Sequence, residues 1–139
     1  MPRPLRVALA IIAGLAVALA MLAAVEGFGV WAHPFPPEFT GTHDEICAHV
    51  TRYPAWVLGA VVSMWSVASF VCTWVAGRLA GARLAATVTA ALFATALGVN
   101  LGMLPYPAWF RLAAFPAVVL SAFVGTLPFR SRQLKRSLP

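Results

Sequence analysis

The sequence predicts an all-α, polytopic membrane protein: an antiparallel bundle of four transmembrane helices, with a short amphipathic surface helix in its first outer loop. Of its 139 residues, 61% are hydrophobic and only 10% are charged, whereas a soluble domain averages about 45–50% apolar and about 25% charged residues. Because so few charged side chains cannot cover a water-exposed surface, the composition excludes the soluble class. Four long apolar stretches, each near the roughly 20 residues that cross a bilayer, set the number of helices.

The four stretches form one membrane domain of residues 1–139, with spans at about 7–25, 55–76, 84–103 and 109–127. Proline and glycine separate them, with HPFPP after the first span, AGRLAGAR after the second and LPYP after the third. Apart from the first outer loop, residues 27–54, the links are short, and short links favour antiparallel neighbours. Small residues spaced four apart on the first span favour close helix contacts, although general alanine richness explains them equally well.

Positive charges predict the orientation, because loops on the cytoplasmic side carry more Lys and Arg. With both termini cytoplasmic, the inner segments hold eight of the ten cations and all four acids lie outside. We therefore expect a multi-pass protein of the cytoplasmic (inner) membrane, with a basic tail at 129–139. The eight inner cations are Arg3, Arg6, Arg78, Arg83, Arg130, Arg132, Lys135 and Arg136.

The bilayer itself is the first expected partner. The net charge of +6 is concentrated at the inner ends of the spans, where it sets topology and attracts anionic lipid, so nucleic acid is not an expected partner. A cleaved signal peptide is the alternative reading of the first span. Its apolar run is longer than the usual 7–15 residues of a signal peptide, so we expect the helix to be retained.

The outer loop contains the stretch THDEICAHV, residues 42–50. Thr42 followed three residues later by Glu45 is a capping box, in which the hydroxyl and the carboxylate each accept from the other residue's amide. Apolar residues then recur at helical spacing. This pattern predicts a surface helix from about His43 to Arg52.

The same stretch raises the question of a metal site. The weak candidate ligands are His43, Glu45, Cys47 and His49. They form two i, i+4 pairs that point to different sides of one helix, and their spacing matches no zinc signature. We therefore expect neither a metal nor another cofactor here. A pH-sensing role for His43 or His49 is the other chemical possibility.

Polar residues inside a membrane bundle are costly and therefore indicate either structural or functional sites. Glu26, Asn100 and Arg111 fall at similar depth, near the outer ends of three different spans. Glu26 can pair with Arg111 while Asn100 hydrogen-bonds to either, which makes a structural clamp. Arg111 extending to the headgroups and a ligand- or proton-handling cluster are the alternatives.

Several of these features occur together in a recognisable order: Glu26 near the end of the first helix, HPFPP after it, and NLGMLPYPAWF before the last helix. This arrangement resembles a loose group of uncharacterised small bacterial four-helix integral membrane proteins. The resemblance implies the four-helix architecture and transfers no catalytic or binding residue.

No motif identifies a reaction, and we expect no catalytic residues. The leading functional prediction is a non-enzymatic accessory or scaffold subunit that binds a membrane-protein partner or a second copy of itself. The alternative is a small oligomeric transporter or channel-like protein, whose outer-leaflet polar vestibule contains Glu26, Asn100 and Arg111.

Overall fold

A computed structural model describes residues 1–129, and these are all helical or in loops, with no strand among them. The helices are α1 (Arg3–Ala32), α2 (His43–Val50), α3 (Ala55–Ala80), α4 (Arg83–Met103) and α5 (Ala108–Thr126), followed by a short 3-10 turn, η1 (Leu127–Phe129). Of the predicted basic tail, all but Phe129 lies outside the described residues. The all-helical class is confirmed.

Four of the helices are long and apolar enough to span a membrane: α1, α3, α4, and α5 together with η1. Three of these helices have a proline at their start. Pro54 and Pro107 precede α3 and α5, and Pro4 lies in the first turn of α1. Proline fits a helix start because its fixed φ suits the first turn and its missing N–H would have no partner there. At the other end of α3, Gly81 has φ +63°, the left-handed conformation that commonly ends helices.

The largest difference from the predicted spans is at the end of α1, which continues seven residues beyond Val25. Gly27 and Gly29 do not stop it, since the helix ends only where the His33 amide caps the Gly29 carbonyl oxygen, at 2.8 Å. Gly29 is buried, and a Cβ there would lie 3.2 Å from the Tyr53 hydroxyl. The non-helical outer loop is correspondingly shorter, and Glu26 lies well inside a helix instead of at its end.

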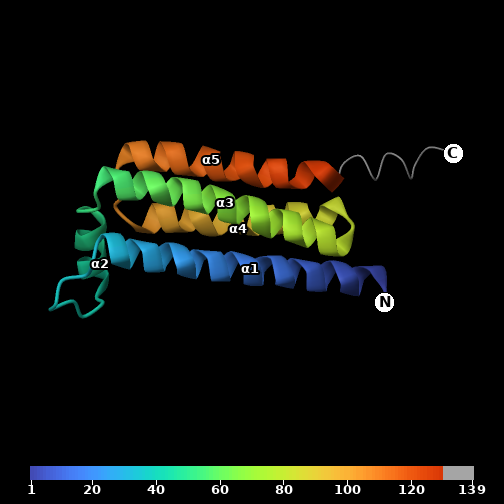
Figure 1. Cartoon of the computed structure of the whole chain (residues 1–139), viewed down its shortest axis with the longest axis horizontal. Helices are drawn as coiled ribbons and strands as arrows, with labels where there is room; N and C mark the ends of the chain where they lie inside the picture. The colour runs from blue at the N-terminus through green and yellow to red at the C-terminus, as the bar shows by residue number, and fades with distance from the viewer. Residues whose placement is uncertain (130–139) are drawn as a thin grey trace.

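The four long helices pack side by side, with α3 in contact with α1, α4 and α5 (Figure 1). Helix α4 also contacts α1 and α5. The end of α1, the start of α3 and the α4–α5 link lie at one end of the molecule, together with α2, whereas the α3–α4 turn lies at the other (Figure 1). We call the end with α2 the loop end.

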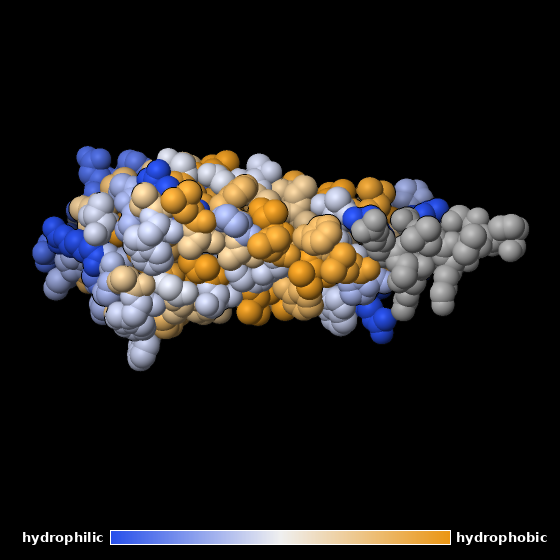
Figure 2. Space-filling model, turned by 90° about the horizontal axis from the view of Figure 1, so that it is seen from above, coloured by the Kyte–Doolittle hydropathy of each residue, from blue (hydrophilic) through white to orange (hydrophobic). Residues whose placement is uncertain are grey.

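Hydropathy changes along the same axis. Figure 2 shows orange, hydrophobic side chains gathered around the middle of the molecule and blue, hydrophilic ones towards its two ends. Many large apolar side chains of the long helices are exposed, among them Ile12, Leu19, Leu112 and Leu120. This distribution is typical of a protein surrounded by lipid, since lipid tails are as apolar as the side chains that face them.

Close contacts between helices depend on small residues. Ala10, Gly14 and Ala18 are buried along α1. A Cβ at Gly14 would lie only 2.9 Å from both the Ala76 Cβ and the Cys72 carbonyl oxygen of α3. Gly125 of α5 approaches α3 in the same way, with the Phe70 carbonyl oxygen 3.0 Å from its Cβ position. The small residues are therefore used for packing inside the chain.

A buried hydrogen bond also joins α3 to α5. The Ser69 hydroxyl donates to the Val118 carbonyl oxygen, at 3.1 Å, and the Ser69 side chain is fully buried. Pro116 lies inside α5, two residues before the carbonyl that receives this bond. Proline removes one helical hydrogen bond and disturbs the preceding turn. The bond from Ser69 fixes α5 against α3 close to that disturbance.

Candidate functional site

Helix α2 begins with the capping box. The Glu45 amide donates to the Thr42 hydroxyl at 3.4 Å, and the Glu45 carboxylate accepts from the Thr42 amide at 3.2 Å. The same carboxylate oxygen also accepts from the amide and hydroxyl of Thr40, at 3.0 and 2.8 Å. The Thr40 hydroxyl bond is the largest of the causes that lower the pKa of Glu45 below its ordinary value. Glu45 is occupied in holding the loop against the helix start.

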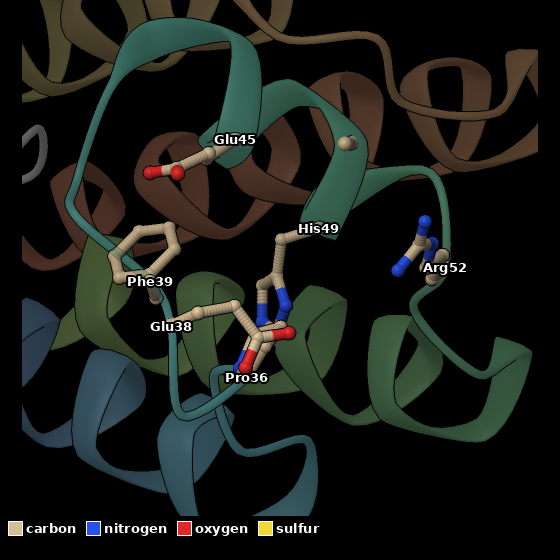
Figure 3. Close-up of a pocket in the computed structure, with 7 residues that line it drawn as sticks. Pro36, Glu38, Phe39, Glu45, His49 and Arg52 are labelled. Carbon is tan, nitrogen blue, oxygen red and sulfur yellow. The ribbon is translucent and has the colours of Figure 1, made fainter.

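The four candidate metal ligands do not converge on one point. The Cys47 thiol and the His43 Nε2 are 3.5 Å apart on the exposed side of α2. Glu45 and His49 leave the helix in different directions, and His49 points into the space under the loop (Figure 3). In residues 1–129, no group of three or more His, Cys, Asp or Glu side chains is placed to hold a metal ion.

His49 belongs instead to a cluster of stacked rings that joins α2 to the ends of α1 and α3. Its ring centroid lies 4.3 Å from that of His33, 4.4 Å from Phe35 and 5.2 Å from Tyr53. The His49 side chain is buried, and burial lowers its pKa, with smaller contributions from the charges of His33 and Arg52. We call His33, Phe35, Phe39, His49 and Tyr53 the ring cluster.

A surface cavity of about 190 Å³ lies beside the ring cluster. Figure 3 shows its lining, with Phe39, Glu38 and Pro36 from the loop opposite His49 and Arg52. Glu38, Glu45 and Arg52 all border this cavity, which is open at the surface of the molecule.

Two further cavities lie deeper in the loop end and share three residues: Glu26 of α1, Trp65 of α3 and Asn100 of α4. The first, of about 210 Å³, is otherwise lined by apolar residues of α1 and α4, such as Leu22 and Phe93. The second, of about 110 Å³, extends beneath α2 to Tyr53 and Tyr106. We call the pair of cavities the chamber.

Three buried polar atoms on the chamber wall have no hydrogen-bond partner among the described residues. The Asn100 Oδ1 and the Trp65 Nε1 belong to residues that line both cavities, and the His49 Nε2 belongs to a residue that lines the smaller one. The Trp65 side chain is only 5% exposed. A buried polar group without a partner costs about 1–3 kcal/mol. Such atoms are therefore expected to meet either ordered water or a bound molecule.

The chamber wall also includes two phenols. Burial raises the pKa of Tyr53, and the charge of Glu26 raises it further. The same two causes, in the same order, raise the pKa of Tyr106. Both phenols therefore contribute hydroxyl groups to a wall that also contains Glu26.

The structure brings together two of the three predicted polar residues. Glu26 and Asn100 line both cavities of the chamber. Arg111 lines neither; its guanidinium donates to the Leu104 carbonyl oxygen at 3.1 Å, and the side chain is exposed. Arg111 therefore closes the α4–α5 link by binding a carbonyl near the end of α4.

Sequence reasoning did not single out His33, Tyr53, Tyr106 or Trp65 as members of a site. Trp65 packs with its ring 5.6 Å from that of Phe110 and 6.5 Å from that of Tyr106. The sequence did carry one local signal for three of them: His33, Tyr53 and Tyr106 each lie next to a proline at a helix end, where loop residues of the same end can meet.

Comparison with models of known families, with curated proteins and with solved structures finds no match for this chain. The resemblance to small bacterial four-helix proteins therefore stays a prediction from the quoted residues.

Proposed function

We propose that this protein is a non-enzymatic, multi-pass protein of the cytoplasmic membrane that binds a small ligand in the chamber at its loop end. Its helices form an antiparallel bundle with both termini cytoplasmic, and the loop end faces outward. The observation that carries the proposal is the chamber itself, in which Glu26, Trp65 and Asn100 from three helices line both cavities.

Charge placement supports the orientation. Arg3 and Arg6 at the start of α1, and Arg78 and Arg83 beside the α3–α4 turn, lie at the end opposite α2. The acids Glu38, Asp44 and Glu45 lie in or next to α2. An excess of basic residues marks the cytoplasmic side of a membrane protein, so the loop end is the outer one.

The unpaired polar atoms favour ligand binding over a purely structural role. A clamp between helices would satisfy its own polar groups, because that is how such a clamp stabilises. Here the Asn100 Oδ1 and the Trp65 Nε1 do not pair with each other or with Glu26, so both are available to a bound molecule or to ordered water. Largely apolar walls with a few convergent polar groups are typical of small-molecule sites.

Transport is the natural use of such a site, and the chain would perform it as an oligomer. The residues that line the chamber lie toward the loop end, so the chamber by itself does not connect the two sides of the membrane. A second copy, or a membrane-protein partner, would complete the path. Binding in the outer chamber is the step that one chain can carry alone.

Thiol labelling tests the proposal. The background carries Cys47→Ser and Cys72→Ala, which removes both native thiols. In this background, Asn100→Cys should react with a membrane-impermeant thiol reagent added outside intact cells. Val99→Cys is the matched control, because Val99 is its neighbour in α4 and is 55% exposed on the apolar surface of the bundle; it should react at least tenfold more slowly.

Equal rates at positions 99 and 100 would contradict the outward-facing chamber. In that case the accessory-subunit function becomes the better account. Purification in a mild detergent would then be expected to recover a second membrane protein in fixed stoichiometry.

A further inference from the structure

The lining of the chamber has an unbalanced charge. Glu26 is its one acid, and neither lysine nor arginine lines either cavity among the described residues. His49, at the far wall of the smaller cavity, has its pKa lowered by burial. A ligand that enters therefore meets a carboxylate without a fixed positive partner on the wall.

The unpaired atoms of Asn100 and Trp65, the two residues beside Glu26 that line both cavities, define what else the ligand must carry. The Asn100 Oδ1 is a hydrogen-bond acceptor, whereas the Trp65 Nε1–H is a donor only. A ligand that pairs with all three residues therefore carries hydrogen-bond donors for Glu26 and Asn100, and an acceptor oxygen for the Trp65 indole. Hydrogen bonds between an ionised donor and a carboxylate are about twice as strong as neutral ones.

Aromatic rings add to the preference for a cation. Trp65, Tyr106 and Phe93 all contribute to the chamber wall, and a cation near an aromatic face is attracted by the negative charge of the ring. For size, an apolar cavity of about 150 Å³ holds benzene, so the larger cavity, of about 210 Å³, has room for a small amine.

We infer that the chamber binds an amino alcohol group of the ethanolamine type: a primary ammonium held by Glu26 and Asn100, with an oxygen that accepts from the Trp65 indole N–H. This inference rests on the proposed function and names its ligand class. The group can come from a free small amine or from the headgroup of an ethanolamine phospholipid, and the chemistry at the chamber is the same.

Three ligands of nearly equal size separate the contribution of the ammonium from that of the oxygen. Ethanolamine carries both the ammonium and the oxygen, n-propylammonium lacks the oxygen, and 1-propanol lacks the ammonium. Titration calorimetry on the purified full chain in detergent should rank them in that order, with 1-propanol at least tenfold weaker than ethanolamine. Equal binding of 1-propanol and ethanolamine would overturn the inference, and this comparison needs no variant.

Variants then locate the site. Glu26→Gln should weaken ethanolamine binding at least tenfold, and Trp65→Phe should remove the advantage of ethanolamine over n-propylammonium. Glu38→Gln is the matched control, since Glu38 is an exposed loop acid outside the chamber; it should bind as the parent does. An equal loss in Glu26→Gln and Glu38→Gln would also overturn the inference.

Nanodiscs distinguish the two sources. If the lipid headgroup is the ligand, nanodiscs of phosphatidylethanolamine should slow thiol labelling at Ala96→Cys, which lines the larger cavity without binding the ammonium, at least fivefold relative to phosphatidylcholine. If a free amine is the ligand, the two lipids give equal rates and soluble ethanolamine binds. If phosphatidylethanolamine does not slow labelling and soluble ethanolamine does not bind, the inference is overturned. If the thiol reagent does not label Asn100→Cys from outside intact cells, the proposed function is overturned instead.

Discussion

Two glutamates at the loop end show how position decides the role of one residue type. Glu45 accepts three hydrogen bonds, two from Thr40 and one from Thr42, and is thereby committed to the start of α2. Glu26 lies on a long helix and borders the chamber instead. The sequence predicted the Thr42–Glu45 cap because capping is a local pattern of four residues. It did not predict the chamber wall, which depends on three helices meeting.

The cap gives a first prediction at this scale. Thr42→Ala should destabilise α2 by about 1 kcal/mol, the usual loss when a capping hydroxyl is removed. Amide hydrogen exchange within His43–Val50 should then be about fivefold faster. Thr95→Ala, at an exposed position in α4, is the control and should leave α2 unchanged. Unaltered exchange in Thr42→Ala would show that the loop holds α2 without the cap.

The ring cluster gives a second prediction, on pH. The folded protein lowers the pKa of His49, chiefly by burial, so the unfolded chain binds the proton more readily. Stability at the loop end should therefore be present above about pH 6.5, the ordinary histidine value, and should be lost as the pH falls below it.

Hydrogen exchange of α2 across pH 5–8 measures this loss. His49→Phe keeps a ring beside His33 and Phe35 but removes the titration, so the exchange rate, corrected for its intrinsic pH dependence, should change little with pH. His43→Asn, at the exposed side of α2, should keep the parent profile after correction for intrinsic exchange rates. The same profile in His49→Phe and in the parent would refute the role of His49.

At the scale of the elements, the four long helices were predictable because a continuous apolar stretch has few alternatives in a bilayer. The residues at which these helices end were harder to predict. Helix α1 runs to Ala32 through Gly27 and Gly29, because Tyr53 packs against it there, and a contact between residues 24 apart in the chain leaves no local signal. The stacking of His33 on His49 escaped sequence reasoning for the same reason.

Helix packing gives a third prediction. Gly14→Ala should destabilise the protein by about 1–3 kcal/mol, since the new methyl group would lie 2.9 Å from the backbone oxygen of Cys72 and from Ala76. Gly27→Ala in the same helix has open space around its Cβ and should be neutral or stabilising, by up to about 1 kcal/mol. Thermal unfolding in detergent measures both variants. Equal midpoints for the two would contradict the close contact of α1 with α3.

At the scale of the whole molecule, the ends of the bundle differ in chemistry. The loop end carries the acids, the ring cluster and the chamber, whereas cations gather at the other end of the described helices. Three of the four exposed tryptophans, Trp31, Trp56 and Trp109, lie at the helix ends nearest the loop end, and the fourth, Trp74, lies toward the other end of α3. Tryptophan is enriched at membrane–water interfaces, which supports a bilayer boundary at this level, with the chamber just inside it.

The most direct test of this account measures thiol labelling at one chamber position from each side of the membrane. In the cysteine-free background, Glu26→Cys is compared with Arg78→Cys, at the opposite end of the bundle, in right-side-out and inverted vesicles. We predict that Glu26→Cys reacts at least tenfold faster in right-side-out vesicles, and that Arg78→Cys shows the reverse preference. Labelling of Glu26→Cys from the inverted side alone, or from neither side, would contradict an outward-facing chamber.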